Sequence, residues 1–501
     1  MPGFPVQIKK MEVLGLGEIE AIREAAFDVM ATTGVMVGGE EAHRLLEDAG
    51  CHVDRERSMV RFPREVVETA LAVTPRSFVL KAQDESNSLE IGKDDHLYFF
   101  SSCGLHTVDL DTWEQREPTR KEFHDFVRVL DSLPNVDGIA PFIWWGFARV
   151  PQAMRLLESN AAKLRLSTKA QGEGAVLGND TWNVEMARAV GQDLWNLVNP
   201  VAPLAIPEEE SAKIIRLARA DMPFSVTAGP TLGATAPATL AGGLVSNAAE
   251  HLAALVLAQV VRPGTRFISG HMAHAQNMTN GSPFFGQVTN ALQAAGFNQL
   301  WDLLGVPTYN TCSTWTGSKS IDYQAGYETA LAATIAAASG ASLLPMQGGM
   351  TAQLAASPVK AIIDDDVAGM IGRFLQGIEV TGDTLAVDLI KQVGPMPGTY
   401  LGEAHTREWW RKEQYRPVVA DHSSYEEWAT SGKKVALDHA REKMDALVAS
   451  HPGTRLSASQ EEAVESILQE ARAHYRKTGL ITEEEWAVYQ EDLNSDEYPY
   501  A

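Results

Sequence analysis

The chain has 501 residues, of which 45% are hydrophobic, and a formal net charge of -23 at pH 7. This length is enough for one large domain with additions, and the strongly acidic balance argues against nucleic-acid and anionic-membrane partners, because both surfaces repel a negative field. Small cationic ligands suit such a charge.

The three cysteines, Cys51, Cys103 and Cys312, are far apart and show no CxxC spacing, so we expect neither a disulfide framework nor a structural zinc site. No stretch of about 18 uninterrupted apolar residues occurs, and the N-terminus lacks a charged region followed by an apolar core. These features predict a soluble, cytoplasmic protein.

The first part of the chain has apolar residues at helical spacing, followed by two short strand-like segments. The pattern predicts helices over residues 17–33, 40–49 and 63–73, and small strands over residues 77–80 and 88–91. We expect residues 1–95 to form a helical cap with small strands.

Eight short apolar stretches follow, and each ends in residues able to touch a ligand. They are residues 98–103, 138–144, 164–170, 201–206, 224–229, 266–272, 307–313 and 342–348. Buried parallel strands have this pattern, and most of the intervening segments have helical spacing. The chain is therefore predicted to be an α/β protein, with a (β/α)8 TIM barrel over residues 96–450. Barrel active sites lie at the C-terminal ends of the strands, so the last residues of each stretch are candidate site residues.

Aromatic side chains gather at these candidate ends. They are Phe99 and Phe100 in the first stretch, Trp144 and Trp145 at the second, Phe284 and Phe285 after the sixth, and Tyr309 and Trp315 around the seventh. Aromatic faces attract cations, quaternary ammonium groups above all, at about 0.5 to 2 kcal/mol per ring. Alternatively, every second residue fills the barrel core, since strand side chains alternate in direction.

Two histidines, His271 and His274, come directly after the sixth stretch. Two imidazoles can bind a metal, but no third ligand is apparent, so we expect no metal here. A hydrogen-bonding role towards a substrate carboxylate or a structural role remains open for each.

A glycine-rich stretch covers residues 229–237, and Gly348 and Gly349 end the eighth stretch. Backbone N–H groups at Gly229, Gly233, Gly348 and Gly349 can receive a cofactor or anion, although the spacing is neither a P-loop nor GxGxxG. An equally consistent interpretation is a loop that lets another surface approach the barrel mouth.

Several catalytic signatures are absent from the sequence: there is no GxSxG elbow, no HExxH, no dinucleotide motif and no recognisable nucleophile with a base. Three consecutive glutamates, residues 208–210, are more typical of a solvated helix start. We therefore expect chemistry that needs little proton transfer from the protein, and no catalytic residue is assigned.

After His451-Pro452-Gly453 the composition changes to Gln, Glu, Ala and Arg with helical periodicity. Residues 451–501 are predicted to be a C-terminal helical extension with an acidic tail. The sequence leaves open whether this part is a docking helix pair or a partly disordered end.

Residues 12–450 resemble the trimethylamine methyltransferase (MttB-like) superfamily in order and spacing. The residues that carry the resemblance are Thr33-Gly34-Val35, Pro75-Arg76, Val261-Arg-Pro-Gly264, Gly270, Met278, Gly281, Ser318-Lys319, Asp322, Gln324-Ala-Gly-Tyr-Glu328, Asp364 to Asp366, Gly377-Ile-Glu-Val380, His405-Thr406 and Trp428.

The resemblance implies a barrel that moves a methyl group from a methylated amine to the Co(I) centre of a separate corrinoid (cobalamin) protein, with no tightly bound cofactor of its own. Founding members use pyrrolysine. This chain has only standard residues, with Pro345-Met-Gln-Gly348 in the last strand region, and resembles the non-pyrrolysine branch that acts on quaternary amines such as glycine betaine. Asn277 stands where an acidic residue is expected, and His271 and His274 replace small residues, so the methylated substrate stays open.

In such a protein the aromatic faces would hold the cation, and a polar group would hold the substrate's tail; His271, Gln347 and Lys169 are the candidates. Two alternatives stay open. One is a metal-dependent TIM-barrel lyase or hydrolase using His271 and His274, and the other is a betaine-binding protein without catalysis. The sequence does not indicate the oligomeric state, although barrels of this type often form oligomers.

Overall fold

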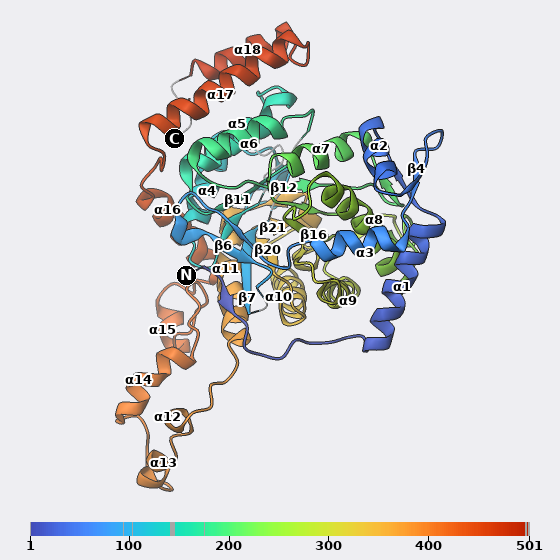
Figure 1. The fold of residues 1–501 in the computed structure, drawn as a ribbon. Helices are drawn as coiled ribbons and strands as arrows, with labels where there is room; N and C mark the ends of the chain where they lie inside the picture. Colours follow the sequence, from blue (N-terminus) through green and yellow to red (C-terminus); the bar gives the residue numbers. More distant parts are fainter. Residues whose placement is uncertain are drawn as a thin grey trace.

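The computed structural model describes residues 2–93, 95–102, 104–140, 146–174, 176–495 and 498. Eight parallel strands form its centre, and the last pairs with the first, so that Leu343 lies opposite Tyr98 and the sheet closes (Figure 1). The strands are β7 (His96–Ser101), β10 (Gly138–Ile139), β11 (Ala170–Glu173), β12 (Trp195–Val198), β14 (Phe224–Val226), β16 (Phe267–His271), β19 (Thr308–Asn310) and β20 (Leu343–Gln347). The predicted (β/α)8 TIM barrel is confirmed.

One helix follows each barrel strand and covers the outside of the sheet (Figure 1). These helices are α4 (Arg120–Ser132), α5 (Gln152–Leu166), α6 (Asp180–Val190), α7 (Glu208–Arg219), α8 (Leu240–Val261), α9 (Val288–Leu304), α10 (Tyr323–Ala338) and α11 (Pro358–Leu375). Among the described residues α8 alone is long and apolar enough to cross a membrane, but 78% of its apolar window is buried within the protein. It is a core helix that packs against α1, α3, α7 and α9.

Two of the predicted strands were misplaced along the sequence. Residues 164–166 end α5, and the third strand is β11 at Ala170–Glu173. The fourth strand is β12 at Trp195–Val198, whereas β13 (Ala205–Ile206) pairs with β2 (Val35–Val37) in another sheet. Both true strands contain polar residues that face the helix layer, such as Gln171, whose amide bonds carbonyls of α5 and its C-cap, so their apolar character is weak in the sequence.

The N-terminal part covers one side and one end of the barrel. Helices α1 (Leu16–Thr32), α2 (Glu40–Asp48) and α3 (Arg64–Val73) pack against α8, and the small strands β2, β3 (His52–Asp54) and β4 (Met59–Arg61) lie beside them. The hairpin of β5 (Phe78–Leu80) and β6 (Leu89–Ile91) packs on the barrel interior at the N-terminal ends of the strands. Strand β1 (Phe4–Pro5) pairs antiparallel with the start of β7.

The eighth βα unit ends with α11, and the chain then leaves the barrel. It forms an extended arm with the short helices α12 (Gly382–Leu385), α13 (Val387–Val393), α14 (Ala404–Glu413) and α15 (Tyr425–Thr430) (Figure 1). The chain then returns as α16 (Ala436–Ser450), which packs on α4 and α11.

The C-terminal extension is a docked helix pair, α17 (Ala458–Lys477) and α18 (Glu483–Leu493), and α17 packs on α5 and α6. At its centre the buried Arg472 guanidinium lies 2.8 Å from the Glu158 carboxylate of α5 and 2.7 Å from Glu465. Arg472 also donates to the hydroxyls of Tyr489 and Tyr498. These charged groups compensate one another in a site closed to water, which fixes the position of the pair.

We predict that Arg472→Ala destabilises the protein by about 3 to 5 kcal/mol, because it leaves the fully buried Glu158 carboxylate without its cation. Arg476→Ala is the matched control: it lies one turn further along α17, its partner Glu483 is exposed, and the expected loss is below about 1 kcal/mol. Urea unfolding followed by circular dichroism measures both. Equal losses for the two variants would contradict the role of the buried pair.

Candidate functional site at the barrel mouth

The mouth lies at the C-terminal ends of the barrel strands, and the loops there form small sheets of their own. After β14 and β16, β15 (Thr231–Leu232) pairs with β17 (His274–Gln276), which pairs with β18 (Pro283–Phe284). After β20, β21 (Gly349–Met350) pairs with β22 (Ala355–Ala356). These pairings make the rim an ordered structure that can hold side chains in place.

An aromatic cluster lies within this rim. The rings of Phe285 and Trp315 meet edge to face at 5.1 Å between centroids, and the ring of Phe285 lies 4.7 Å from that of His274. Cys312 packs with them, together with Met272 and Ala352. The loops after the sixth, seventh and eighth strands thus converge on one apolar group, which we call the mouth cluster.

A carboxylate from α10 holds the loop that carries Trp315. Glu328 accepts hydrogen bonds from the Thr316 hydroxyl at 2.7 Å and from the Gly317 N–H at 2.8 Å. A side chain at Gly286, next to Phe285, would collide with the Glu328 carboxylate. Glu328 therefore holds the backbone beside Trp315 by hydrogen bonds and packs closely against the backbone beside Phe285. The sequence singled it out only as part of a motif, because nothing local shows which loops a helix residue will reach.

The indole N–H of Trp315 is buried and has no hydrogen-bond partner among the described residues. A buried N–H without an acceptor costs about 1 to 3 kcal/mol. A ligand that brings an acceptor, such as a carboxylate, to this N–H would recover that free energy. Trp315 can therefore offer one ligand both an aromatic surface and a hydrogen-bond donor.

Two other predicted aromatics lie deeper, in the barrel interior. Trp195 on β12 connects them: its ring is 5.4 Å from that of Phe100 and 4.4 Å from that of Tyr309. All three are buried among Leu80, Ile268 and Leu343. They fill the core of the barrel beneath the mouth. Trp195 was not predicted, because the fourth strand was placed later in the sequence.

Phe99 lies on the opposite side of the barrel wall. It packs against Phe4, with ring centroids 5.8 Å apart, in a cluster that includes α11. Trp144 and Trp145 lie outside the described residues. Of the predicted aromatics that the structure describes, Phe285 and Trp315 therefore stand in the mouth cluster.

The two histidines do not point at a common position. His271 is fully buried in the wall, its ring lies 5.1 Å from that of Phe297 on α9, and its Nδ1 lies 3.6 Å from the Cys312 sulfur. His274 uses one ring nitrogen with the Thr231 hydroxyl and the other with the Met272 carbonyl. Within the described ranges no group of three or more His, Cys, Asp or Glu side chains is arranged to hold a metal. The donor geometry therefore does not fit a metal centre made by these two residues.

The predicted polar residues Lys169 and Gln347 also lie outside the lumen. Lys169 precedes β11, and its ammonium donates to the carbonyls of Leu130 and Leu133, at the end of α4. Burial lowers the pKa of Lys169. Gln347 donates to the Asn135 carbonyl at 3.1 Å. Both side chains satisfy backbone carbonyls near the end of α4 rather than facing a ligand at the mouth.

The four glycines predicted to bind a cofactor lie on the rim loops. A side chain at Gly229 would collide with Met272, and one at Gly349 with Ser102. Gly348 has φ +97° and donates its N–H to Asp364 at 2.9 Å, and Gly233 has φ +90°. Close packing and left-handed backbone thus account for glycine at these positions, and the N–H of Gly348 is already bound.

The Cys312 thiol in the mouth cluster and the Glu173 carboxylate at the end of β11 are poorly suited to acid–base work. Burial raises the pKa of the Cys312 thiol well above its usual range, so the reactive thiolate is not formed at neutral pH. Glu173, at the end of β11, is buried against Lys163 of α5 at 2.8 Å, on the outer side of the wall. Neither group offers a free base to the mouth.

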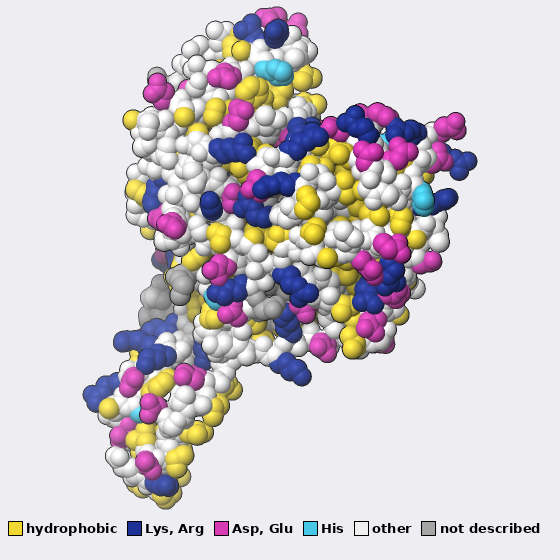
Figure 2. Space-filling view, viewed as in Figure 1, with side chains coloured by type: hydrophobic (Ala, Val, Ile, Leu, Met, Phe, Trp, Pro, Cys, Tyr) yellow, Lys and Arg dark blue, Asp and Glu magenta, His cyan; other side chains and the backbone are white. Residues whose placement is uncertain are grey.

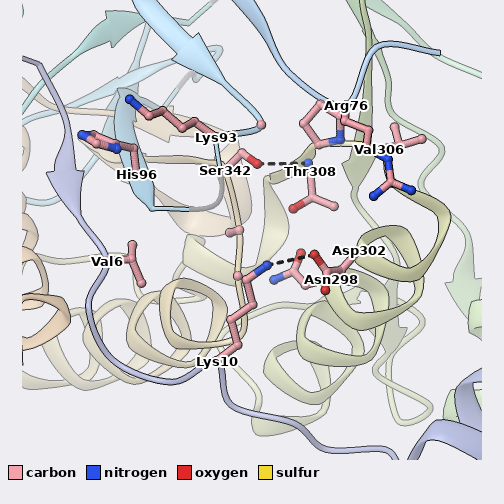
Figure 3. A pocket seen from close by; sticks show the side chains of 15 residues that line it. Val6, Lys10, Arg76, Lys93, His96, Asn298, Asp302, Val306, Thr308 and Ser342 are labelled. Atoms are coloured by element: carbon pink, nitrogen blue, oxygen red, sulfur yellow. Dashed lines mark hydrogen bonds and ion pairs between the residues drawn. The ribbon is translucent and has the colours of Figure 1, made fainter. Parts of the chain in front are cut away.

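A cavity also lies at the other end of the barrel, between the starts of β19 and β20 and the N-terminal segment (Figure 3). Lys10 pairs there with Asp302 at 2.8 Å, and Arg76, Lys93 and His96 surround the opening. Catalytic groups of TIM barrels lie at the C-terminal ends of the strands, so this cavity is separate from the mouth.

Comparison with known proteins places the chain among amine methyltransferases. A family model described as trimethylamine methyltransferase (MTTB) matches residues 1–475. The glycine betaine methyltransferase of Desulfitobacterium hafniense (strain Y51) is 28% identical over 433 residues, which cover 84% of this chain and 89% of that protein. Trimethylamine methyltransferase MttB of D. hafniense (strain DSM 10664 / DCB-2) is 27% identical over 492 residues, 93% of this chain and 96% of that protein. The solved monomethylamine methyltransferase (MtmB) of Methanosarcina barkeri covers 86% of this chain and 92% of its own, at 12% identity and TM-score 0.48.

The burial of His271 predicts a specific pH dependence. Burial lowers its pKa to about 3, so the native ring stays neutral where the unfolded chain takes up a proton near pH 6.5. This contribution to stability is complete above about pH 6.5 and is lost as the pH falls towards 3. We therefore expect the free energy of unfolding of the wild type to fall by about 2 kcal/mol more than that of His271→Gln when the pH is lowered from 7 to 5. Urea unfolding at the two pH values measures this. If the difference in unfolding free energy between the wild type and His271→Gln did not change with pH, the neutral, buried state of the ring would be contradicted.

Proposed function

The chain belongs to the trimethylamine methyltransferase (MTTB) family, and from this we propose that it transfers a methyl group from a quaternary amine of the betaine type to the Co(I) centre of a separate corrinoid protein. The chain is a methyltransferase. The choice of a quaternary zwitterion rests on the mouth cluster. That cluster combines aromatic rings with the unpartnered N–H of Trp315.

The rings of Phe285 and Trp315 suit the cationic end of such a substrate. A quaternary ammonium group cannot donate a hydrogen bond, so it is held by desolvation and by the negative faces of rings. Met272 adds a polarizable apolar surface beside them. The Trp315 N–H, which lacks a partner, suits the carboxylate end. A trimethylamine substrate would leave this donor unpaired, which supports the zwitterion over the simple amine.

The scarcity of free acid–base groups at the mouth agrees with this chemistry. A quaternary nitrogen leaves as a neutral tertiary amine when its methyl group is taken, so no proton needs to move. The protein's task is then to hold the methyl group in line with its acceptor and to exclude water. The protonated Cys312 and the paired Glu173 are consistent with a site that works by positioning.

The filled barrel interior supports a corrinoid carried by another protein. Phe100, Trp195 and Tyr309 occupy the core beneath the mouth, which leaves the rim as the place where a methyl group can meet its acceptor. The reduced corrinoid, when present, supplies the nucleophile. This chain's rim residues would orient the substrate so that its methyl group faces outward.

The metal-dependent alternative finds little support, because His274 uses both ring nitrogens within the protein and His271 is sealed in the wall. A betaine-binding protein without catalysis would share the mouth cluster. Transfer of a methyl group separates that alternative from the proposal.

The direct test incubates the purified protein with glycine betaine and free cob(I)alamin. We expect methylcobalamin, seen in its absorption spectrum, and dimethylglycine in equal amounts. Related quaternary zwitterions in place of glycine betaine establish which methylated substrate is preferred. Binding of these compounds with no methylcobalamin formed would overturn the proposed transfer.

The mouth cluster can be tested by a pair of adjacent residues. Phe285→Ala and Trp315→Ala should each weaken betaine binding by about 1 to 2 kcal/mol, or about 5- to 30-fold in Kd, because each removes a ring from the cation. Phe284→Ala is the matched control, since Phe284 is 39% exposed whereas Phe285 is 6% exposed. Isothermal titration calorimetry measures the affinities. If Phe284→Ala weakens binding as much as Phe285→Ala does, the cluster is not the cation site.

Methyl transfer should not depend on a metal bound by this chain. After treatment with EDTA and gel filtration, we expect unchanged rates with free cob(I)alamin, because His271 and His274 do not converge on one position. Loss of activity that zinc or manganese restores would favour the metal-dependent alternative.

A further inference from the structure

A cavity of about 90 Å³ lies at the N-terminal end of the barrel, opposite the mouth (Figure 3). It is lined by the N-terminal segment, the turn between β6 and β7, the end of α9 and the starts of β19 and β20. Such a volume holds a few waters or one small molecule. None of its lining residues belongs to the mouth cluster, so the proposed methyl transfer does not account for it.

Two polar side chains in the wall of this cavity are buried, and each has an atom without a partner. Thr308 on β19 is 3% exposed, and its hydroxyl has no hydrogen-bond partner among the described residues. Asn298 on α9 is 1% exposed, and its side-chain Oδ1 likewise has none within the described ranges. Because the Nδ2 of Asn298 donates to the Ala336 carbonyl at 3.2 Å, the remaining atom Oδ1 is an acceptor. A ligand between the two residues (Figure 3) that brings one acceptor and one donor would satisfy both.

Arg76 adds a cation to the edge of the cavity. Its guanidinium has no hydrogen-bond or ion-pair partner in the described part of the chain. It packs against Gly305, the C-cap of α9, where a side chain would approach its Nε to 2.9 Å. A guanidinium binds a carboxylate through two parallel N–H···O hydrogen bonds. Arg76 and the Thr308 hydroxyl thus provide donors for a carboxylate.

The charges around the cavity balance one another. Each of the other basic side chains that line it has an acidic partner: Lys10 with Asp302 at 2.8 Å, Lys93 with Glu90 at 2.7 Å, and His96 with Asp95 at 2.6 Å. The C-terminal ends of α9 and α10 lie at the same cavity, and each carries about half a negative charge, which offsets Arg76. The cavity therefore has positive and negative groups but no net charge. This favours a neutral, dipolar ligand over a simple anion such as phosphate.

We propose that this cavity binds a small amino acid in its zwitterionic form. The carboxylate accepts hydrogen bonds from Arg76 and Thr308, and the ammonium group donates to Oδ1 of Asn298 near the end of α9. A quaternary amine such as glycine betaine has no N–H and would leave Asn298 without a donor, so the cavity distinguishes amino acids from the proposed methyl donor. A ligand bound here contacts the barrel and the helix layer together and so stabilises the native state.

Isothermal titration calorimetry of the full chain with glycine tests this site. We expect a Kd of about 1 mM or below, weakened about 10-fold in Arg76→Gln, which loses the charged donor, and about 5-fold in Thr308→Val, which keeps the shape of the side chain without its hydroxyl. Arg44→Gln is the matched control, because it removes the same charge from an exposed position on α2 and should change the Kd less than about 2-fold. No binding of glycine at about 10 mM, or equal losses in Arg76→Gln and Arg44→Gln, would overturn the proposal.

Glycine betaine has the same carboxylate as glycine but no N–H, and it therefore separates this cavity from the mouth cluster. We expect Arg76→Gln to leave the affinity for glycine betaine unchanged, and Trp315→Ala to leave the affinity for glycine unchanged. If Arg76→Gln weakened the binding of both compounds equally, the site for an amino-acid zwitterion would be refuted. Because glycine has no methyl group to give, its titration stands apart from the proposed methyl transfer.

Discussion

The filling of the barrel by aromatic rings is the constraint on which the rest of the structure depends. Trp195 contacts both Phe100 and Tyr309, and the β5–β6 hairpin packs beneath them, so the interior is a solid core. The interior of a closed sheet of eight strands is just wide enough for side chains to fill it, and here aromatic rings do so. Ligand chemistry is therefore restricted to the loops at the mouth, where Phe285 and Trp315 meet.

Helix α10 links the barrel wall to that mouth. Glu328 receives hydrogen bonds from the Trp315 loop, and its carboxylate fits closely against Gly286 beside Phe285. One buried side chain thus contacts both of the loops that carry the two aromatic rings. Such support matters for a reaction that depends on alignment, because a displacement of about 1 Å can cost 100-fold in rate.

The additions to the barrel are attached by two different kinds of contact. The α17–α18 pair docks through a buried network centred on Arg472 and Glu158, whose charges are satisfied within the chain. The arm of residues 376–418 exposes its apolar side chains and buries none. The first addition satisfies its charges within the chain, whereas the second leaves its apolar side chains exposed to solvent (Figure 2).

The sequence by itself determined the (β/α)8 fold, the family and the two strands of the β5–β6 hairpin, because apolar periodicity, glycines and motifs are local properties. It placed the third and fourth strands wrongly, since Gln171 and Asn196 interrupt the apolar pattern; in the structure their amide N–H groups donate to backbone carbonyls of α5 and of the wall.

Only the tertiary structure decided which candidates face the mouth. Adjacent residues of a strand point to opposite sides, so Phe100 fills the barrel while Phe99 packs on Phe4. Lys169 and Gln347 turned out to bind backbone carbonyls near the end of α4, and His271 to lie within the wall. The direction of a side chain depends on strand register and loop closure, which involve residues far apart in the sequence.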